Sequence, residues 1–250
     1  MGDPFKPGAG GGSGEPARFD TTRWSVVESA GRSTCAESRE ALSTLCRLYW
    51  YPVYAYARHR GLNADQAADL TQGFFALLIE QKMVRGADAS RGKFRSYLLG
   101  AFKHFMSHEW ARARARKRGG DRKLVALDAR LAEERYGVEP AHELTAQRLF
   151  ERQWALRLLE LAMEDLRDQC AREGKGRLFE VFKPFLSGGT GNGYREAGAE
   201  LGLGEGAARV AAHRLRARYR ELLREHIGRT VGSAEQIEEE IHHLFSAVGT

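Results

Sequence analysis

The sequence contains few of the residues that hold small folds together through covalent bonds or metal ions. Its three cysteines, Cys35, Cys46 and Cys170, lie far apart, form no C-x-x-C pair and are odd in number. This pattern fits neither a disulfide framework nor a zinc site. With 250 residues, the chain is long enough to bury an apolar core without such links. We therefore expect a folded protein of the reducing cytoplasm.

Long apolar runs are absent as well. The longest strongly apolar run, residues 74–79, is far shorter than the roughly 20 residues that span a bilayer. Residues 1–18 lack the basic start and apolar stretch of a signal peptide and are rich in Gly and Pro, which indicates a flexible leader. The chain is expected to have no membrane partner.

Strand-like alternation is also missing, and apolar residues recur at the spacings of three and four that are typical of amphipathic helices. Such stretches run through residues 42–57, 70–78 and 94–105, and Pro52 can kink the first of them. The sequence therefore predicts an all-α fold with two helical domains joined by a flexible linker. The expected parts are a disordered leader at 1–18, a first domain at 19–118, a linker with room for one short helix at 119–148, a second domain at 149–228 and an acidic extension at 229–250.

The positive charge is concentrated in two short segments. Residues 91–118 hold nine Lys and Arg against one Glu, and residues 207–220 hold five Arg and no acid. Because the whole chain carries only +6, the remainder is net acidic. This asymmetry indicates a polyanion as partner.

The second basic segment belongs to a helix, turn and helix pattern at 194–225. The small residues Ala197 and Gly198 would let the two helices approach closely, and the second helix has an apolar stripe opposite an arginine face. This is the pattern of a helix-turn-helix, whose second helix enters the DNA major groove. An ordinary helix pair with a solvated arginine face remains the alternative.

The first basic segment is different because aromatic residues lie among its cations. Aromatic rings beside Lys and Arg suit unpaired bases, which stack on them. Most of these rings fall on the apolar stripe of the helix and are expected in the core. Whether Tyr97, His104 and His108 lie in the core or at the surface is less predictable.

Sequence motifs of enzyme active sites are incomplete or absent in this chain. His104 and His108 have no third metal ligand in sight, and the SGGTGNG stretch at 187–193 lacks the Gly-Lys-Ser/Thr ending of a phosphate loop. No G-x-S-x-G motif and no distinctive carboxylate pair occurs. We predict no catalytic residue, no metal and no cofactor, and thus no enzyme.

Three stretches resemble bacterial RNA polymerase sigma factors of the extracytoplasmic-function class. DQAADLTQGFF at 65–75 is similar to the family's D-x-A-E-D-L-x-Q-E-x-F segment, and FRSYLL at 94–99 to its F-R-x-W-L segment. GEGAARVAAHRLR at 204–216 is similar to S-E-G-T-V-K-S-R-L-H-R-A-R. The resemblance covers about residues 40–226, and its motifs occur in the family's order.

This resemblance implies a promoter-specificity subunit that binds core RNA polymerase and promoter DNA and directs transcription initiation. The residues implied to bind the polymerase, mainly its β′ clamp helices and also its β flap, are Asp65, Asp69, Leu70, Gln72 and Phe75. Those implied to recognise and melt the minus-ten element are Phe94, Arg95, Tyr97, Lys103, His104, His108, Arg112 and Arg114. Those implied to read the minus-thirty-five element are Arg209, His213, Arg214, Arg216 and Arg220. An anti-sigma factor is a further partner that the resemblance would allow.

The sequence departs from the family at several of these positions. Ala68 and Gly73 stand where the family usually has glutamates, and His104 and His108 replace the usual Asn and Asp. The family's base preference at these positions therefore does not carry over to this chain.

Two alternative functions stay open. One is a stand-alone helix-turn-helix regulator, and the other is an RNA-binding or metal-dependent nucleic-acid enzyme. A solvated terminal helix is the simpler interpretation of the acidic extension, and a cover over a basic surface is the other.

Overall fold

The computed structural model describes residues 36–80, 93–115, 127–137, 144–186, 193–231 and 233–249. Within these ranges every regular element is a helix and no strand occurs, so the all-α class is confirmed. The expected leader at 1–18 and the glycine-rich stretch at 187–192 lie outside the described residues. No helix in the described part of the chain combines the length and the apolar character needed to cross a bilayer.

Helices α2 (Ala36–His59) and α3 (Ala64–Glu80) pack against each other. Helix α2 continues through Pro52, with Val53 and Tyr54 fully buried beside it. At the start of α3, the Asn63 side chain accepts a hydrogen bond from the Gln66 backbone N–H at 2.9 Å, and the Gln66 side chain accepts one from the Asn63 N–H at 3.1 Å. This reciprocal pair satisfies backbone donors that the first turn of a helix leaves open.

Helix α4 (Phe94–Ala115) packs on α3 through aromatic rings. The ring of Phe74 lies 5.1 Å from that of Phe102 and 5.7 Å from that of Phe105, in edge-on and tilted geometries that aromatic pairs favour. Phe102 is fully buried. The apolar stripe expected for this basic helix is therefore its core-facing side.

The expected linker contains helix α5 (Leu127–Gly137), which docks on the first helices. The Glu133 carboxylate accepts hydrogen bonds from the Tyr54 hydroxyl at 2.5 Å and from the Arg58 guanidinium at 2.6 and 2.8 Å. Ala132 is buried. Residues 127–137 of the expected linker are thus a packed helix. The hydrogen bonds that hold it join residues 75 or more positions apart, so no local sequence pattern marks them.

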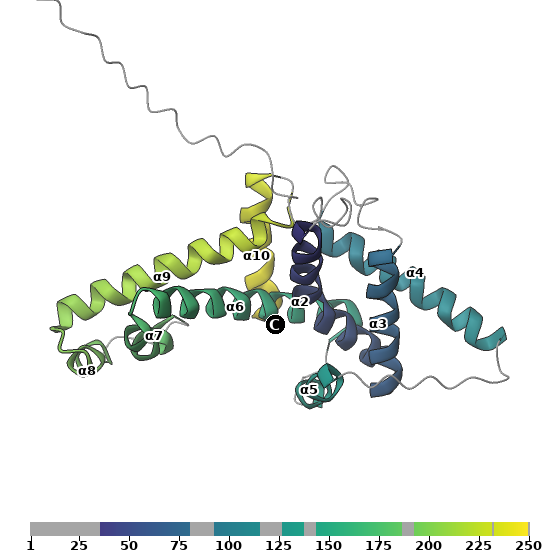
Figure 1. The fold of residues 1–250 in the computed structure, drawn as a ribbon, viewed down its shortest axis with the longest axis horizontal. Helices are drawn as coiled ribbons and strands as arrows, with labels where there is room; N and C mark the ends of the chain where they lie inside the picture. Colours follow the sequence, from purple (N-terminus) through teal and green to yellow (C-terminus); the bar gives the residue numbers. More distant parts are fainter. Residues whose placement is uncertain are drawn as a thin grey trace, which may run out of the picture.

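Helix α6 (Ala146–Arg172) lies at the centre of the molecule (Figure 1). The Thr145 side chain caps its first turn by accepting from the Arg148 N–H at 3.2 Å, and its 27 residues span about 40 Å. Both α2 and α9 pack on it, and their buried residues belong to a single core cluster. The division into two domains therefore stays a prediction.

The remaining helices follow α6 in short steps. They are α7 (Gly176–Phe182), the short 3-10 helix η3 (Lys183–Phe185), α8 (Gly193–Glu200), α9 (Glu205–Gly228) and α10 (Ala234–Val248). In Figure 1, α8 and the start of α9 lie at one end of the long axis and α4 at the other. Helix α10 packs back onto α6 and α9, with Ile237 and Leu244 buried. The acidic extension is therefore a packed helix, which contradicts the simpler interpretation of a solvated one.

Candidate nucleic-acid interface

Helices α8 and α9 are joined by a tight turn. Gly202 adopts a left-handed φ of 67°, which a glycine tolerates at no steric cost. The Leu203 N–H donates to the Gly198 carbonyl at 2.8 Å and the Gly202 N–H to the Ala199 carbonyl at 3.1 Å, the paired bonds of a Schellman C-cap. The chain thereby leaves α8 and enters α9 within four residues, 201–204.

Gly198 is the point of closest approach in this pair. A Cβ atom added there would lie 2.8 Å from the Leu203 carbonyl oxygen and 3.0 Å from the Ala208 Cβ. The expectation that Gly198 lets the two helices approach closely is confirmed. Any larger side chain would push α9 away from α8.

The two sides of α9 differ in chemistry as the sequence predicts. Ala208, Ala212 and Leu215 are buried against the neighbouring helices. Exposed cationic and imidazole side chains along α9 include Arg209, His213, Arg214 and Arg220. We name these four residues the α9 basic face. Because α9 continues past α8 with this face in solvent, all four can reach a polyanion.

Arg216 does not belong to the α9 basic face. Its guanidinium donates to the Phe185 carbonyl at 3.0 Å and to the Tyr194 hydroxyl, and the side chain is half-buried. These bonds tie α9 to η3 and α8. The structure favours a positioning role for Arg216 over the DNA contact expected from the sequence.

Arg209 makes weaker contacts within the protein than Arg216 does. It pairs with Glu205 at 2.7 Å and lies over the Tyr194 ring at 5.3 Å, yet 57% of its side chain stays exposed. An exposed i, i+4 ion pair of this kind is worth only about 0.3–0.5 kcal/mol. A phosphate or base edge can therefore displace Glu205 at small cost.

A shallow open groove runs along the same helix. Its lining residues are Arg214, Ala217, Arg218, Arg220, Glu221 and Arg224. Arg218 donates to the Gln169 side chain at 2.8 Å and pairs with Glu221 at 2.9 Å. The groove continues the α9 basic face toward the centre of the molecule.

The expected minus-ten residues on α4 divide into buried and exposed sets. Phe94 is fully buried, with its ring 5.5 Å from that of Tyr49, so it is a core residue that offers no surface to DNA. Tyr97 and Lys103 are half-buried, and burial raises the pKa of the Tyr97 hydroxyl. His104 and His108 are exposed, with ring centroids 4.5 Å apart.

Arg95 is the largest departure from the expected minus-ten surface. It is only 8% exposed, and its Nε lies 3.0 Å from a carboxylate oxygen of Glu240 on α10. The expected DNA contact at Arg95 is therefore closed in this structure, because a distant acidic residue covers it. Arg112 and Arg114 lie on α4, but their side chains fall outside the described residues.

The expected polymerase-binding residues on α3 also split. Asp65 and Asp69 are exposed, and Leu70 and Gln72 are half-buried. Phe75 is 4% exposed and packs edge-on against Phe74 at 5.6 Å, so it supports α3 from the core side. Four of the five residues thus remain available to a partner.

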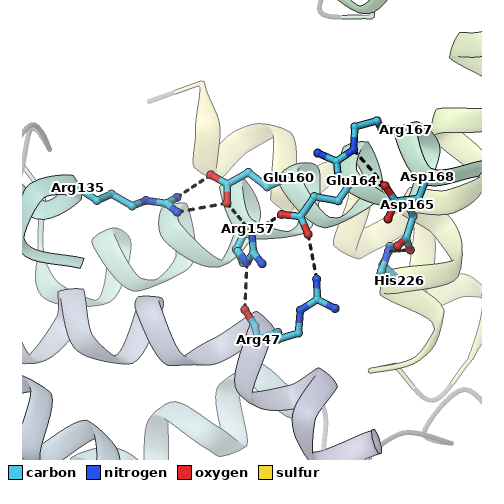
Figure 2. A network of polar contacts seen from close by, with 9 residues as sticks. All are labelled: Arg47, Arg135, Arg157, Glu160, Glu164, Asp165, Arg167, Asp168 and His226. Carbon is cyan, nitrogen blue, oxygen red and sulfur yellow. Dashed lines mark hydrogen bonds and ion pairs between the residues drawn. The ribbon is translucent and has the colours of Figure 1, made fainter. Parts of the chain in front are cut away.

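An ion-pair network along α6 was not predicted (Figure 2). Arg157 pairs with Glu160 and Glu164 at 3.0 Å, Arg47 of α2 pairs with Glu164 at 2.9 Å, and Arg135 of α5 with Glu160 at 3.0 Å. The spacing of Arg157, Glu160 and Glu164 places them on one side of α6, which is a sequence signal for such a network. These pairs join α2 and α5 to α6, with Arg135 and Arg157 largely covered and Arg47 still 59% exposed.

At the far end of the network, His226 of α9 lies 2.9 Å from Asp165 of α6 (Figure 2). Burial and the nearby Arg229 lower the pKa of His226, and Asp165 only partly opposes them. The imidazole is therefore neutral near pH 7 and links the two helices by a hydrogen bond.

Metal binding and known relatives complete the description of the site. Among the described residues no group of three or more His, Cys, Asp or Glu is arranged to hold a metal ion, and His104 with His108 gains no third ligand there. No protein-family model, no curated protein and no solved structure matches this chain.

Proposed function

We propose that this chain is a promoter-specificity subunit that binds core RNA polymerase, recognises and opens promoter DNA, and directs transcription initiation in the cytoplasm. The observation that carries the proposal is the α8–turn–α9 pair. A glycine-dependent close approach holds a second helix whose basic face lies in solvent. Short helix, tight turn and exposed basic helix are what a major-groove reader requires.

The α9 basic face supplies the duplex contact in this proposal. Arg209 and Arg214 can each donate two parallel hydrogen bonds to a guanine edge, and one good bidentate pair discriminates among bases by about 1–3 kcal/mol. Arg220 lies farther along α9 and suits a backbone phosphate, which contributes affinity without sequence information. Arg216 keeps α9 at its angle to α8 through Phe185 and Tyr194.

The exposed side of α4 supplies the contact to opened DNA. His104, His108 and the half-buried Tyr97 offer rings to unpaired bases, and Lys103 lies on the same helix, with its ammonium 3.3 Å from the Gln147 side chain. Capturing bases offsets an unpairing cost of a few kcal/mol. Since α4 and the start of α9 lie at opposite ends of the molecule (Figure 1), the two contacts fall on separate parts of a promoter.

The exposed side of α3 supplies the dock for the polymerase. Asp69 and Gln72 are the residues that the family resemblance favours, and Asp65 lies one turn earlier on the helix. Catalysis belongs to the polymerase in this division of labour. The chain itself contributes position and sequence preference.

Run-off transcription tests the proposal. Purified chain and bacterial core polymerase are incubated with genomic fragments, and discrete transcripts are expected only when both are present. Asp69→Ala with Gln72→Ala should abolish these transcripts without changing helicity, whereas Asp168→Ala, an exposed acidic residue on α6, should not.

Two results would overturn the proposal. One is the absence of chain-dependent transcripts on every fragment. The other is tight duplex binding by the isolated chain together with indifference to Asp69→Ala, which would favour the stand-alone regulator.

A further inference from the structure

Helix α10 is a part of the molecule that the proposed function does not use. Its Ile237 and Leu244 side chains are buried, and the helix packs on α6 and α9. Its Glu238 pairs with Arg224 of α9. This acidic helix thus contacts α9 four residues beyond one of the two basic segments, residues 207–220.

The same helix reaches the other basic segment through a buried carboxylate. Glu240 is 1% exposed, and its oxygens lie 3.0 Å from Arg95 Nε and 3.0 Å from Lys93 Nζ. Glu239 lies 3.7 Å from the same Lys93 ammonium. Residues 93–95 form the beginning of α4, so α10 holds the start of the helix that the proposed function assigns to opened DNA.

Side chains of α6 and α10 also surround the Arg95 guanidinium, which is only 8% exposed. Arg95 lies 5.1 Å above the Trp154 ring of α6 and 3.6 Å from Glu151. His243 of α10 lies 3.6 Å from the other oxygen of Glu151 and closes the same side. A buried charged side chain needs an oppositely charged partner, because leaving it unpaired is costly. Arg95 must therefore exchange Glu240 for the new partner before it can contact a phosphate or a base.

We propose that α10 is an autoinhibitory brace that covers Arg95 in the free chain and must undock before the start of α4 can contact DNA. The inference rests on the proposed function, since it assigns regulation to the same α4 surface. Two features suit α10 to this part. It follows α9 after a short connection and is held by few side chains, and its acidic residues occupy the Lys93 and Arg95 positions that a phosphate would take.

The test uses the full chain with Glu240→Gln. Glutamine keeps the volume and an acceptor oxygen, and Arg95 retains Glu151, so the fold is expected to survive, which circular dichroism checks. Labelling of Arg95 by phenylglyoxal, followed by mass spectrometry, should become at least about fivefold faster, within the range typical of coupled sites. Arg209, whose side chain is already 57% exposed, is the internal reference for labelling.

The functional arm measures transcript yield with core polymerase at limiting chain concentration. Glu240→Gln should raise the yield at least about fivefold by the same coupling. Glu238→Gln is the matched control, because it removes an exposed carboxylate whose pair contributes little, and it should change both readouts far less than Glu240→Gln does. Leu244→Ala is a second variant that loosens α10 without altering its charge, and it should act in the direction of Glu240→Gln.

The outcomes separate the brace from the proposed function. If wild-type chain supports transcription while Glu240→Gln and Leu244→Ala leave Arg95 labelling or yield unchanged, the brace is wrong and the function stands. If no variant supports transcription or binds polymerase, the proposed function fails, and autoinhibition of it fails too, whatever the labelling shows.

Discussion

The two basic segments of this chain look alike by charge but differ in what their cations do. On α9, Arg209, His213 and Arg214 lie in solvent, and Arg209 is engaged by an exposed ion pair and the Tyr194 ring. At the start of α4, Arg95 is buried under Glu240, which lies 145 residues away in the sequence. A run of cations along a sequence therefore counts charges without showing which of them the fold has already used.

The location of the acidic partners explains the difference. Helix α10 returns to the centre of the molecule, where the start of α4 and the end of α9 both lie within its reach, as the pairs of Glu240 and Glu238 show. The first half of α9 extends beyond that reach alongside α8 (Figure 1). Its basic face therefore stays open.

Arg95→Ala should have the largest effect on stability. It leaves Glu240 buried with Lys93 alone, and removing one partner of a buried ion pair costs about 3 kcal/mol or more. Arg214→Ala, at an exposed position on α9, should stay within about 0.5 kcal/mol of wild type. Urea denaturation of both variants measures the difference, and equal free energies of unfolding would erase the contrast between the two segments.

Replacing both Arg209 and Arg214 by Ala should show the reverse pattern. Duplex affinity in the polymerase complex should fall about 100-fold or more, since each base contact contributes about 1–3 kcal/mol. The salt dependence should flatten by about one unit of slope for every phosphate that the variant no longer neutralises.

The matched control for this pair is Arg167→Ala. Arg167 lies on α6, is 56% exposed and is ion-paired with Asp168 as Arg209 is with Glu205. Fluorescence anisotropy on a cognate promoter fragment across a salt series compares the three proteins. A loss of binding free energy from Arg167→Ala half that of the α9 pair, as expected for one charge against two, would mean that net charge alone drives binding.

Gly198→Ala tests what holds the α9 basic face in place. Its Cβ would lie 2.8 Å from the Leu203 carbonyl oxygen, and overpacking of this kind costs about 1–3 kcal/mol. Gly206→Ala on α9 meets nothing within 4 Å and should instead stabilise the helix by about 0.5–1 kcal/mol. Thermal unfolding distinguishes them, and a neutral Gly198→Ala would show that α8 and α9 do not need their close contact.

The pH dependence of stability sharpens the contrast between the two sides of α9. Burial and Arg229 lower the pKa of His226 below its usual 6.5 in the folded state, against the opposing charges of Asp165 and Glu225. The unfolded chain therefore binds a proton more readily, and stability should fall as the pH drops below 6.5.

Variants assign that pH dependence to a residue. His226→Gln should reduce the slope of stability against pH, and adding His243→Gln should reduce it further, because burial lowers the pKa of His243 too. Urea midpoints between pH 5 and pH 7 (about the range in which histidine titrates) provide the measurement, and an unchanged slope in His226→Gln would show that this residue is not the source.

The smallest effect is expected from His104→Ala with His108→Ala on the exposed side of α4. Stability should change by no more than about 0.5 kcal/mol. Binding to a single-stranded oligonucleotide in the polymerase complex should weaken several-fold, because two rings are removed, while duplex binding should not change. Weaker duplex binding instead would assign these histidines to the same task as α9.

Much of the fold follows from the sequence because local periodicity carries it. The apolar stripes at 42–57, 70–78 and 94–105 become the buried sides of α2, α3 and α4, and Gly198 with Gly202 forms the turn between α8 and α9. Long-range pairing carries no such local mark. The docking of α5 through Glu133 and of α10 through Glu240 depends on residues 75 or more positions apart.

In the candidate site too, the sequence predicts the residues that the helical period places and misses those that depend on distant contacts. Arg209, His213, Arg214 and Arg220 lie where the helical period places them, off the buried side that holds Ala208 and Ala212. Phe75, Phe94 and Arg95 were assigned to partners by motif, and the structure buries all three. Arg216 lies on the expected helix but points to Phe185 and Tyr194, because η3 and α8 offer it acceptors that no pattern along α9 contains.

Gel filtration of the purified chain with bacterial core RNA polymerase tests the central claim most directly. The account predicts that the two elute together as a one-to-one complex, and that Asp69→Ala with Gln72→Ala returns the chain to its own elution volume. Separate elution of the wild-type chain would contradict the claim.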